Sequence, residues 1–129
     1  MDILFIIGQI LFGGYFIMSG SNHFLKFRGM SDYAKSQGVP FPELAVFFSG
    51  SLIFLGGLGI LLGSYVKLSV LFLAMFLLPV TLQMHNFWAI SDPAQKMAQK
   101  DNFFRNMAFL GAALMLLAIP ASSWVINLF

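Results

Sequence analysis

Apolar residues fall in four long stretches that short polar segments separate. The stretches cover about residues 3–25, 43–62, 67–90 and 103–124. A helix needs about 20 apolar residues to cross the hydrocarbon core of a bilayer, and each stretch approaches that length. The pattern predicts an all-α integral membrane protein: a four-helix bundle with short loops, forming a single four-span domain over residues 1–129.

The composition supports this interpretation. Of the residues, 59% are hydrophobic and 9% are charged, whereas a soluble domain has roughly 45–50% apolar and about 25% charged residues. A net charge of +2 is too small for a nucleic-acid partner. The chain has no cysteine, which excludes disulfides and cysteine-ligated clusters. We therefore expect a lipid bilayer as the main partner.

Residues that begin and end helices divide the first half of the chain. Ser31 as an N-cap and Gly38 as a left-handed end predict a small interfacial helix of barely two turns in the first connection. Pro42 suits the first turn of the second span. Gly63-Ser64-Tyr65 predicts a tight turn before the third span.

The second half carries two prolines with different expected effects. Pro79 lies inside the third span, where a proline removes a backbone donor, so it predicts a kink. Asp92 followed by Pro93 predicts a capped helix start. The polar residues 94–102 are expected to lie in the interface and to lead into the fourth span.

The basic residues predict an orientation. Six of the seven lie in or near the first and third connections, and Lys67 lies on the other side. Because cytoplasmic loops carry an excess of Lys and Arg, we expect the first and third connections to be cytoplasmic and both termini outside. The small-residue pairs Gly59/Gly63 and Ala108/Ala112 predict close helix packing within the chain, with a homo-oligomer as the alternative.

Polar side chains within the spans are costly and therefore informative. The first span places Tyr15, Ser19, Asn22, His23 and Lys26 on one face. Threading the spans antiparallel brings polar residues of all four to one end of the bundle, where they include His23, Glu43, His85, Asn86, Asn102, Arg105 and Asn106.

The third span carries a second polar stripe, formed by Thr81, His85 and Trp88. By the helical repeat, Gln83 lies almost opposite His85, so both cannot face the bundle axis, and we expect His85 to point inward.

Three interpretations of this polar end stay open. In the first, the residues are interfacial anchors with satisfied hydrogen bonds. In the second, they form a headgroup pocket for a quinone or lipid, and a neutral imidazole donates a hydrogen bond to the ligand carbonyl. In the third, they hold a metal or haem. Two histidines without HxxxH or HExxH spacing argue against a metal site. No GxSxG occurs, so no catalytic residue is assigned. Aromatic residues expected to line the pocket are Phe24, Phe47, Phe87, Trp88 and Phe103.

Several segments resemble the DoxX family in their order and spacing. They are SGSNHF (19–24), YAKSQGVPFPELA (33–45), LPVTLQMHNFWAISDP (78–93) and FFRNMAF (103–109). The third is similar to a branch of the family with an HNFW-like end to helix three. The resemblance implies a four-helix plasma-membrane protein, usually bacterial. Some relatives are subunits of thiosulfate–quinone oxidoreductases, and others associate with oxidative-stress enzymes. By position, the family's patterned polar residues correspond to His23, His85, Asn86 and Asn106.

The leading hypothesis is therefore a membrane subunit or interaction module of a redox or oxidative-stress system, with a redox or stress-response partner protein. We do not expect it to be an enzyme on its own, and a subunit of a quinone-linked oxidoreductase is one form of this hypothesis. His23 and His85 would contact the headgroup of a quinone or lipid, and Asn86 and Asn106 would orient them. Arg105 or Lys26 would favour an anionic species. The remaining expected ligand-binding residues are Ser19, Asn22 and Trp88. The alternatives are a scaffold for a partner enzyme and a carrier of small apolar molecules.

Overall fold

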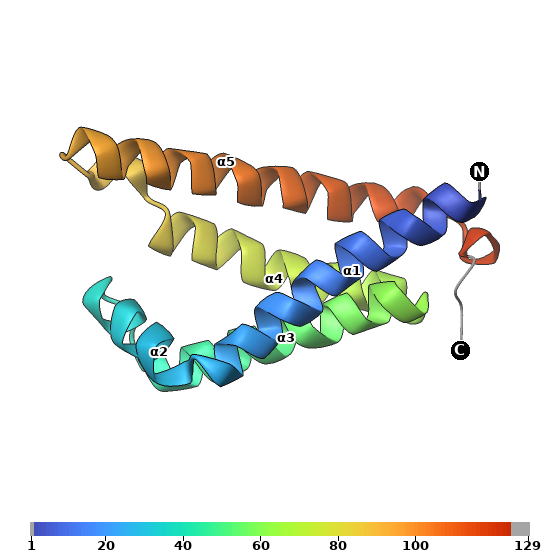
Figure 1. Ribbon diagram of the computed structural model, residues 1–129, viewed down its shortest axis with the longest axis horizontal. Coiled ribbons are helices and arrows are strands. Elements are labelled where there is room, and N and C mark those ends of the chain that lie inside the picture. Colours follow the sequence, from blue (N-terminus) through green and yellow to red (C-terminus); the bar gives the residue numbers. More distant parts are fainter. Residues whose placement is uncertain (1, 125–129) are drawn as a thin grey trace.

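The described part of the chain, residues 2–124 of a computed structural model, is all-helical (Figure 1). Its helices are α1 (Asp2–Leu25), α2 (Phe27–Ser36), α3 (Pro42–Leu62), α4 (Val66–Met84) and α5 (Pro93–Met115), with the short 3₁₀ helices η1 (Phe87–Ala89), η2 (Leu116–Ala118) and η3 (Ala121–Ser123). The all-α class is confirmed.

Three helical segments of the described residues are long and apolar enough to cross a membrane, namely Ile3–Leu25, Pro42–Leu62 and Val66–Ala89. They match the first three predicted spans, and the chain is a membrane protein. A bundle of four spans is not confirmed, because α5 is not among these segments and the described residues form five α-helices. The apolar part of α5, from Phe103 to Met115, extends only about 20 Å, whereas the hydrocarbon core is about 30 Å thick.

Most of the predicted helix ends are confirmed. Gly38 and Gly63 have φ of +80° and +63° and end their segments in the left-handed conformation. Pro42 and Pro93 each stand in a first turn. The Asp92 carboxylate accepts a hydrogen bond of 3.0 Å from the backbone N–H of Gln95, as expected of a cap.

One predicted boundary is wrong. Ser31 does not cap a helix: α2 begins at Phe27 after a break of one residue, and Ser31 lies buried within it together with Ala34. The third span reaches Ala89, close to the predicted Ile90. It is not one continuous α-helix, because α4 ends at Met84, where His85 leaves the helical conformation (φ −121°, ψ 38°), and η1 follows. Pro79 does lie inside α4, and the kink there stays a prediction.

Four glycines bring α1 and α3 into backbone contact, and we call them the glycine seam: Gly13, Gly20, Gly50 and Gly57. A Cβ atom at Gly13 would lie 2.8 Å from the carbonyl oxygen of Gly57, and one at Gly20 would lie 2.8 Å from the backbone nitrogen of Phe54. On both helices the seam glycines are seven residues apart, so they share one face. The absent side chains let the two backbones approach closely.

The small-residue pairs Gly59/Gly63 and Ala108/Ala112, expected from the sequence, do not pack between helices as pairs. Gly59 does pack closely, against Ser69 of α4. Gly63 instead ends α3 in the left-handed conformation. Ala108 and Ala112 are exposed on α5, so that pair makes no packing contact of the expected kind within the described residues.

The long helices run back and forth between two ends of the molecule. Figure 1 shows α2 and the α4–α5 connection at one end, and the start of α1 with the α3–α4 turn at the other. Trp124, the last described residue, packs edge-on against Phe5 at the second end, with ring centroids 5.2 Å apart. The antiparallel arrangement therefore brings the polar ends of α1 and α4 to the same end of the molecule.

Candidate functional site

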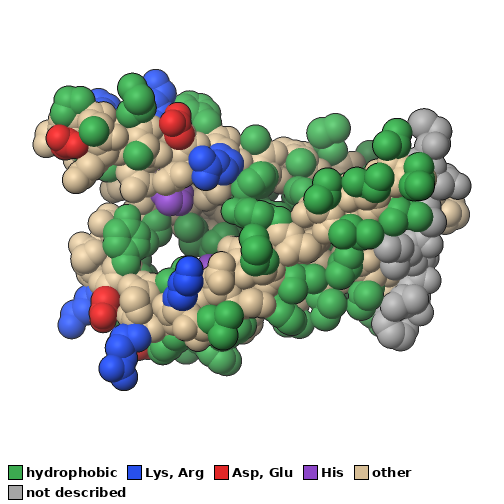
Figure 2. All heavy atoms as spheres, in the orientation of Figure 1, with side chains coloured by type: hydrophobic (Ala, Val, Ile, Leu, Met, Phe, Trp, Pro, Cys, Tyr) green, Lys and Arg blue, Asp and Glu red, His purple; other side chains and the backbone are tan. Residues whose placement is uncertain are grey.

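A cavity of about 1040 Å³ opens at the polar end of the molecule, and we call it the end cavity. Side chains from all five α-helices line it. In Figure 2 the molecule is hollowed at this end, charged side chains gather around the hollow, and histidine atoms show at its edge. Ligand pockets in proteins measure about 300–1,000 Å³, so the end cavity could hold a large headgroup with part of an acyl or prenyl chain.

One wall of the end cavity is the polar face that the sequence predicts on α1. Tyr15, Ser19, His23 and Lys26 line the cavity, and Asn22 does not. Tyr15, Ser19 and His23 recur every four residues on α1, which places them on one face, and Lys26 follows directly after the helix ends.

His23 is held in place on this wall by contacts on three sides. The residue is 6% exposed, and its Nδ1 lies 2.9 Å from the carbonyl oxygen of Ser19. Phe76 of α4 packs edge-on against it, with centroids 5.8 Å apart. A Cβ atom at Gly50 would lie 2.5 Å from the His23 Cβ, so the glycine seam provides the space that the histidine occupies.

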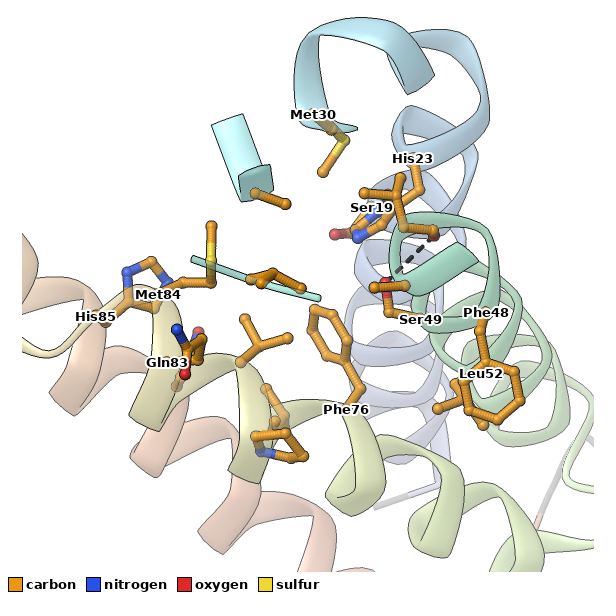
Figure 3. A pocket seen from close by; sticks show the side chains of 18 of the residues that line it. Ser19, His23, Met30, Phe48, Ser49, Leu52, Phe76, Gln83, Met84 and His85 are labelled. Atoms are coloured by element: carbon orange, nitrogen blue, oxygen red, sulfur yellow. Dashed lines mark hydrogen bonds between the residues drawn. The ribbon is translucent and has the colours of Figure 1, made fainter. Parts of the chain in front are cut away.

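The opposite wall comes from the end of α4 and from α5. Figure 3 shows Gln83, Met84 and His85 facing the cavity across from His23 and Ser19. His85 Nδ1 lies 2.7 Å from Gln99 Oε1, and the side-chain amide of Asn102 donates to the same oxygen at 3.4 Å. The expectation that His85 faces inward is thus met.

The expected exclusion between His85 and Gln83 is wrong. Both side chains line the end cavity, because α4 ends at Met84 and His85 no longer follows the helical repeat. The Gln83 side chain also donates a hydrogen bond of 2.9 Å to the carbonyl oxygen of Gln37, just after α2. This Gln83–Gln37 bond links the end of α4 to the segment that follows α2.

Of the expected ligand-binding residues, four line the end cavity and four do not. Ser19, His23, His85 and Asn106 line it. Asn22, Asn86, Trp88 and Arg105 are not among its lining residues. Trp88 is 55% exposed and packs edge-on against Phe87 and Phe103 instead. Because α4 ends at Met84, Phe87 and Trp88 pack against Phe103 of α5.

The expected aromatic lining is also wrong. Phe24 and Phe47 pack on each other outside the cavity, with centroids 5.7 Å apart. The aromatic residues that line the end cavity are Tyr15, Phe16, Tyr33, Phe48, Phe76 and Phe109. They come from deeper in the spans and from α2, whose approach to the cavity depends on the break after α1.

Gln99 is the residue that sequence reasoning missed. It contacts His85 and lies in the stretch that was expected to be merely interfacial. Its spacing from Asn102 and Asn106, three and then four residues, marks a polar face on α5 that could have revealed it. Within residues 2–124, no group of three or more His, Asp or Glu side chains lies close enough to hold a metal ion.

Comparison with known proteins identifies one family. The DoxX family model matches residues 4–86, which include α1 to α4 and both histidines and end before α5. No curated protein and no solved structure matches the chain.

Proposed function

Because the chain belongs to the DoxX family of membrane proteins, we propose that it is a membrane subunit or interaction module of a redox or oxidative-stress system. It binds the headgroup of a quinone-like or lipidic ligand in the end cavity. The observation that carries the proposal is the pairing of two histidines, one on each wall, with a lining that is otherwise largely apolar. A concave apolar site with a few polar groups is the usual form of a small-molecule pocket.

The residues have separate roles in this proposal. His23 and His85 contact the headgroup, and Asn106 and Ser19 line the cavity beside them. Lys26 supplies a positive charge that favours an electron-rich or anionic headgroup. Asn22, Asn86, Trp88 and Arg105 do not line the cavity, and we give them no ligand contact.

The membrane placement is part of the proposal. The chain lies in the bacterial plasma membrane as a single four-span domain, with α2 and the α4–α5 connection on the cytoplasmic side. The packing of Trp124 on Phe5 supports a return of the chain through α5 to the end where α1 begins.

The test is to purify the full chain in mild detergent and identify co-purified quinones and lipids by mass spectrometry. Gly29 lines the end cavity and has open space where a side chain would extend. Gly29→Phe should fill the mouth of the cavity and release the bound amphiphile. Gly111→Phe is the matched control, since Gly111 also has open space but lies away from the cavity. Equal amphiphile content in both variants, or none in the wild type, would refute the proposal.

A membrane scaffold is the alternative, favoured by the exposed first turns of α5. A scaffold would lose its partner enzyme on substitution of Lys35 or Lys96 and keep it in Gly29→Phe. The ligand-binding proposal expects bound amphiphile to be lost in Gly29→Phe and retained when Lys35 or Lys96 is substituted.

A further inference from the structure

The two histidines of the end cavity use the same ring nitrogen for their contacts with the protein. His23 Nδ1 lies 2.9 Å from the carbonyl oxygen of Ser19, and a carbonyl oxygen can only accept. The proton of a neutral His23 ring is therefore on Nδ1. Its Nε2 then carries a lone pair and can only accept a hydrogen bond.

The same argument holds for His85. Its Nδ1 lies 2.7 Å from Gln99 Oε1. That atom is an amide oxygen, which accepts hydrogen bonds, and the side-chain amide of Asn102 also donates to it. The neutral His85 ring is thus also protonated at Nδ1 and has an accepting Nε2.

The lining of the end cavity offers no carboxylate as a partner for either imidazole ring. No Asp or Glu is among the residues that line the end cavity, and Lys26 is the charged residue there. Neither Nε2 has a hydrogen-bond partner among residues 2–124.

We infer that the ligand of the end cavity donates hydrogen bonds, and that its headgroup carries hydroxyl groups of the phenolic, quinol type. A quinone carbonyl only accepts and would leave both Nε2 atoms unpaired, which is costly in an apolar site. The aromatic lining, with Phe76 edge-on to His23, favours a flat aromatic headgroup over a glycerol hydroxyl. This inference rests on the proposed function, and it reverses the hydrogen-bond direction expected from the sequence.

The test measures binding to the detergent-purified full chain at pH 8, where a free imidazole is uncharged. The four probes are decylubiquinol under anaerobic conditions, its dimethyl ether, decylubiquinone and dioleoylglycerol. We expect the quinol to bind at least about tenfold more tightly than the quinone or the ether, the effect of one hydrogen bond to the site. The glycerol lipid should bind less tightly than the quinol.

A second test uses His85→Phe, which removes one acceptor and keeps a ring at a half-buried position. It should reduce the preference for quinol over quinone severalfold, because only the quinol donates a hydrogen bond to this ring. Equal or tighter binding of the quinone or the ether would overturn the inference and leave the proposed function standing. Tighter binding of dioleoylglycerol would replace the phenol with an aliphatic hydroxyl. Binding of none of the four probes would overturn both proposals.

Discussion

The two walls of the end cavity are built by different means. The α1–α3 wall depends on the glycine seam, and α3 buries seven residues. The opposite wall comes from the end of α4, which buries five residues along its length, and from α5, where Ala113 is the buried residue, and it depends on side-chain amides. His23 is therefore positioned by backbone contact, whereas His85 is positioned by the hydrogen bond to Gln99. Substitutions on the first wall should change the fold, and those on the second should change mainly the site.

The largest effect should come from breaking the glycine seam. Gly13→Ala would place a Cβ 2.8 Å from the Gly57 carbonyl oxygen and 2.9 Å from the Leu61 backbone nitrogen, so the helices must separate. We expect the free energy of unfolding in detergent to fall by about 1–3 kcal/mol, as for an overpacked core. Gly14→Ala is the neighbouring control, because Gly14 has open space there. Similar stability of the two variants would show that the seam does not hold the wall.

A smaller effect is expected from removing the support of His85. Gln99→Leu deletes the acceptor of its Nδ1–H and should cost about 1 kcal/mol of unfolding free energy. Its clearer consequence is a loss of quinol preference, because the freed ring can exchange its proton between the two nitrogens. Gln95→Leu, at an exposed position one turn earlier, should leave that preference intact. A retained preference in Gln99→Leu would mean that Gln99 does not orient the ring.

The fold and the site could be predicted from the sequence only in part. The three long apolar stretches and the caps at Asp92 and Gly38 were predictable, because length, hydropathy and local backbone chemistry determine them. The polar face of α1 was predictable for the same reason, since the helix is continuous. The seam was not, because glycines seven residues apart indicate packing only when the partner helix is known. The site beyond Met84 was not predictable either, because the helical repeat no longer applies to His85.

Loss of the Gln83–Gln37 bond, which links α4 to the segment after α2, should have a weaker effect still. It is exposed, so Gln83→Ala should lower the unfolding free energy by no more than about 0.5–1.5 kcal/mol. Because the bond ties Gln83, which lines the end cavity, to the end of α2, which also lines it, its loss should speed the release of decylubiquinol, measured by stopped-flow dilution. Gln37→Ala is the control, since it keeps the backbone carbonyl that accepts the bond. An unchanged release rate in Gln83→Ala would show that the bond does not hold the cavity closed.

The smallest perturbation tests the placement of the walls in the membrane. The chain has no cysteine, so single cysteines can be introduced at the exposed positions Lys35, Lys67 and Lys96. In intact spheroplasts, an impermeant maleimide should label Lys67→Cys and leave Lys35→Cys and Lys96→Cys unlabelled until the cells are lysed. Labelling of Lys35→Cys and Lys96→Cys in different compartments would contradict the antiparallel arrangement.

The most direct measurement is a long-range ¹⁵N–¹H spectrum of the histidine-labelled protein at pH 8. The chain has two histidines, so both rings can be resolved and assigned with His85→Phe. Without ligand, both rings should carry their proton on Nδ1 and show an unprotonated Nε2, whose resonance shifts when decylubiquinol is added. The account would be contradicted by a proton on Nε2 of either ring, or by resonances that the quinol leaves unchanged, because Nε2 of both histidines would then not accept hydrogen bonds from the ligand.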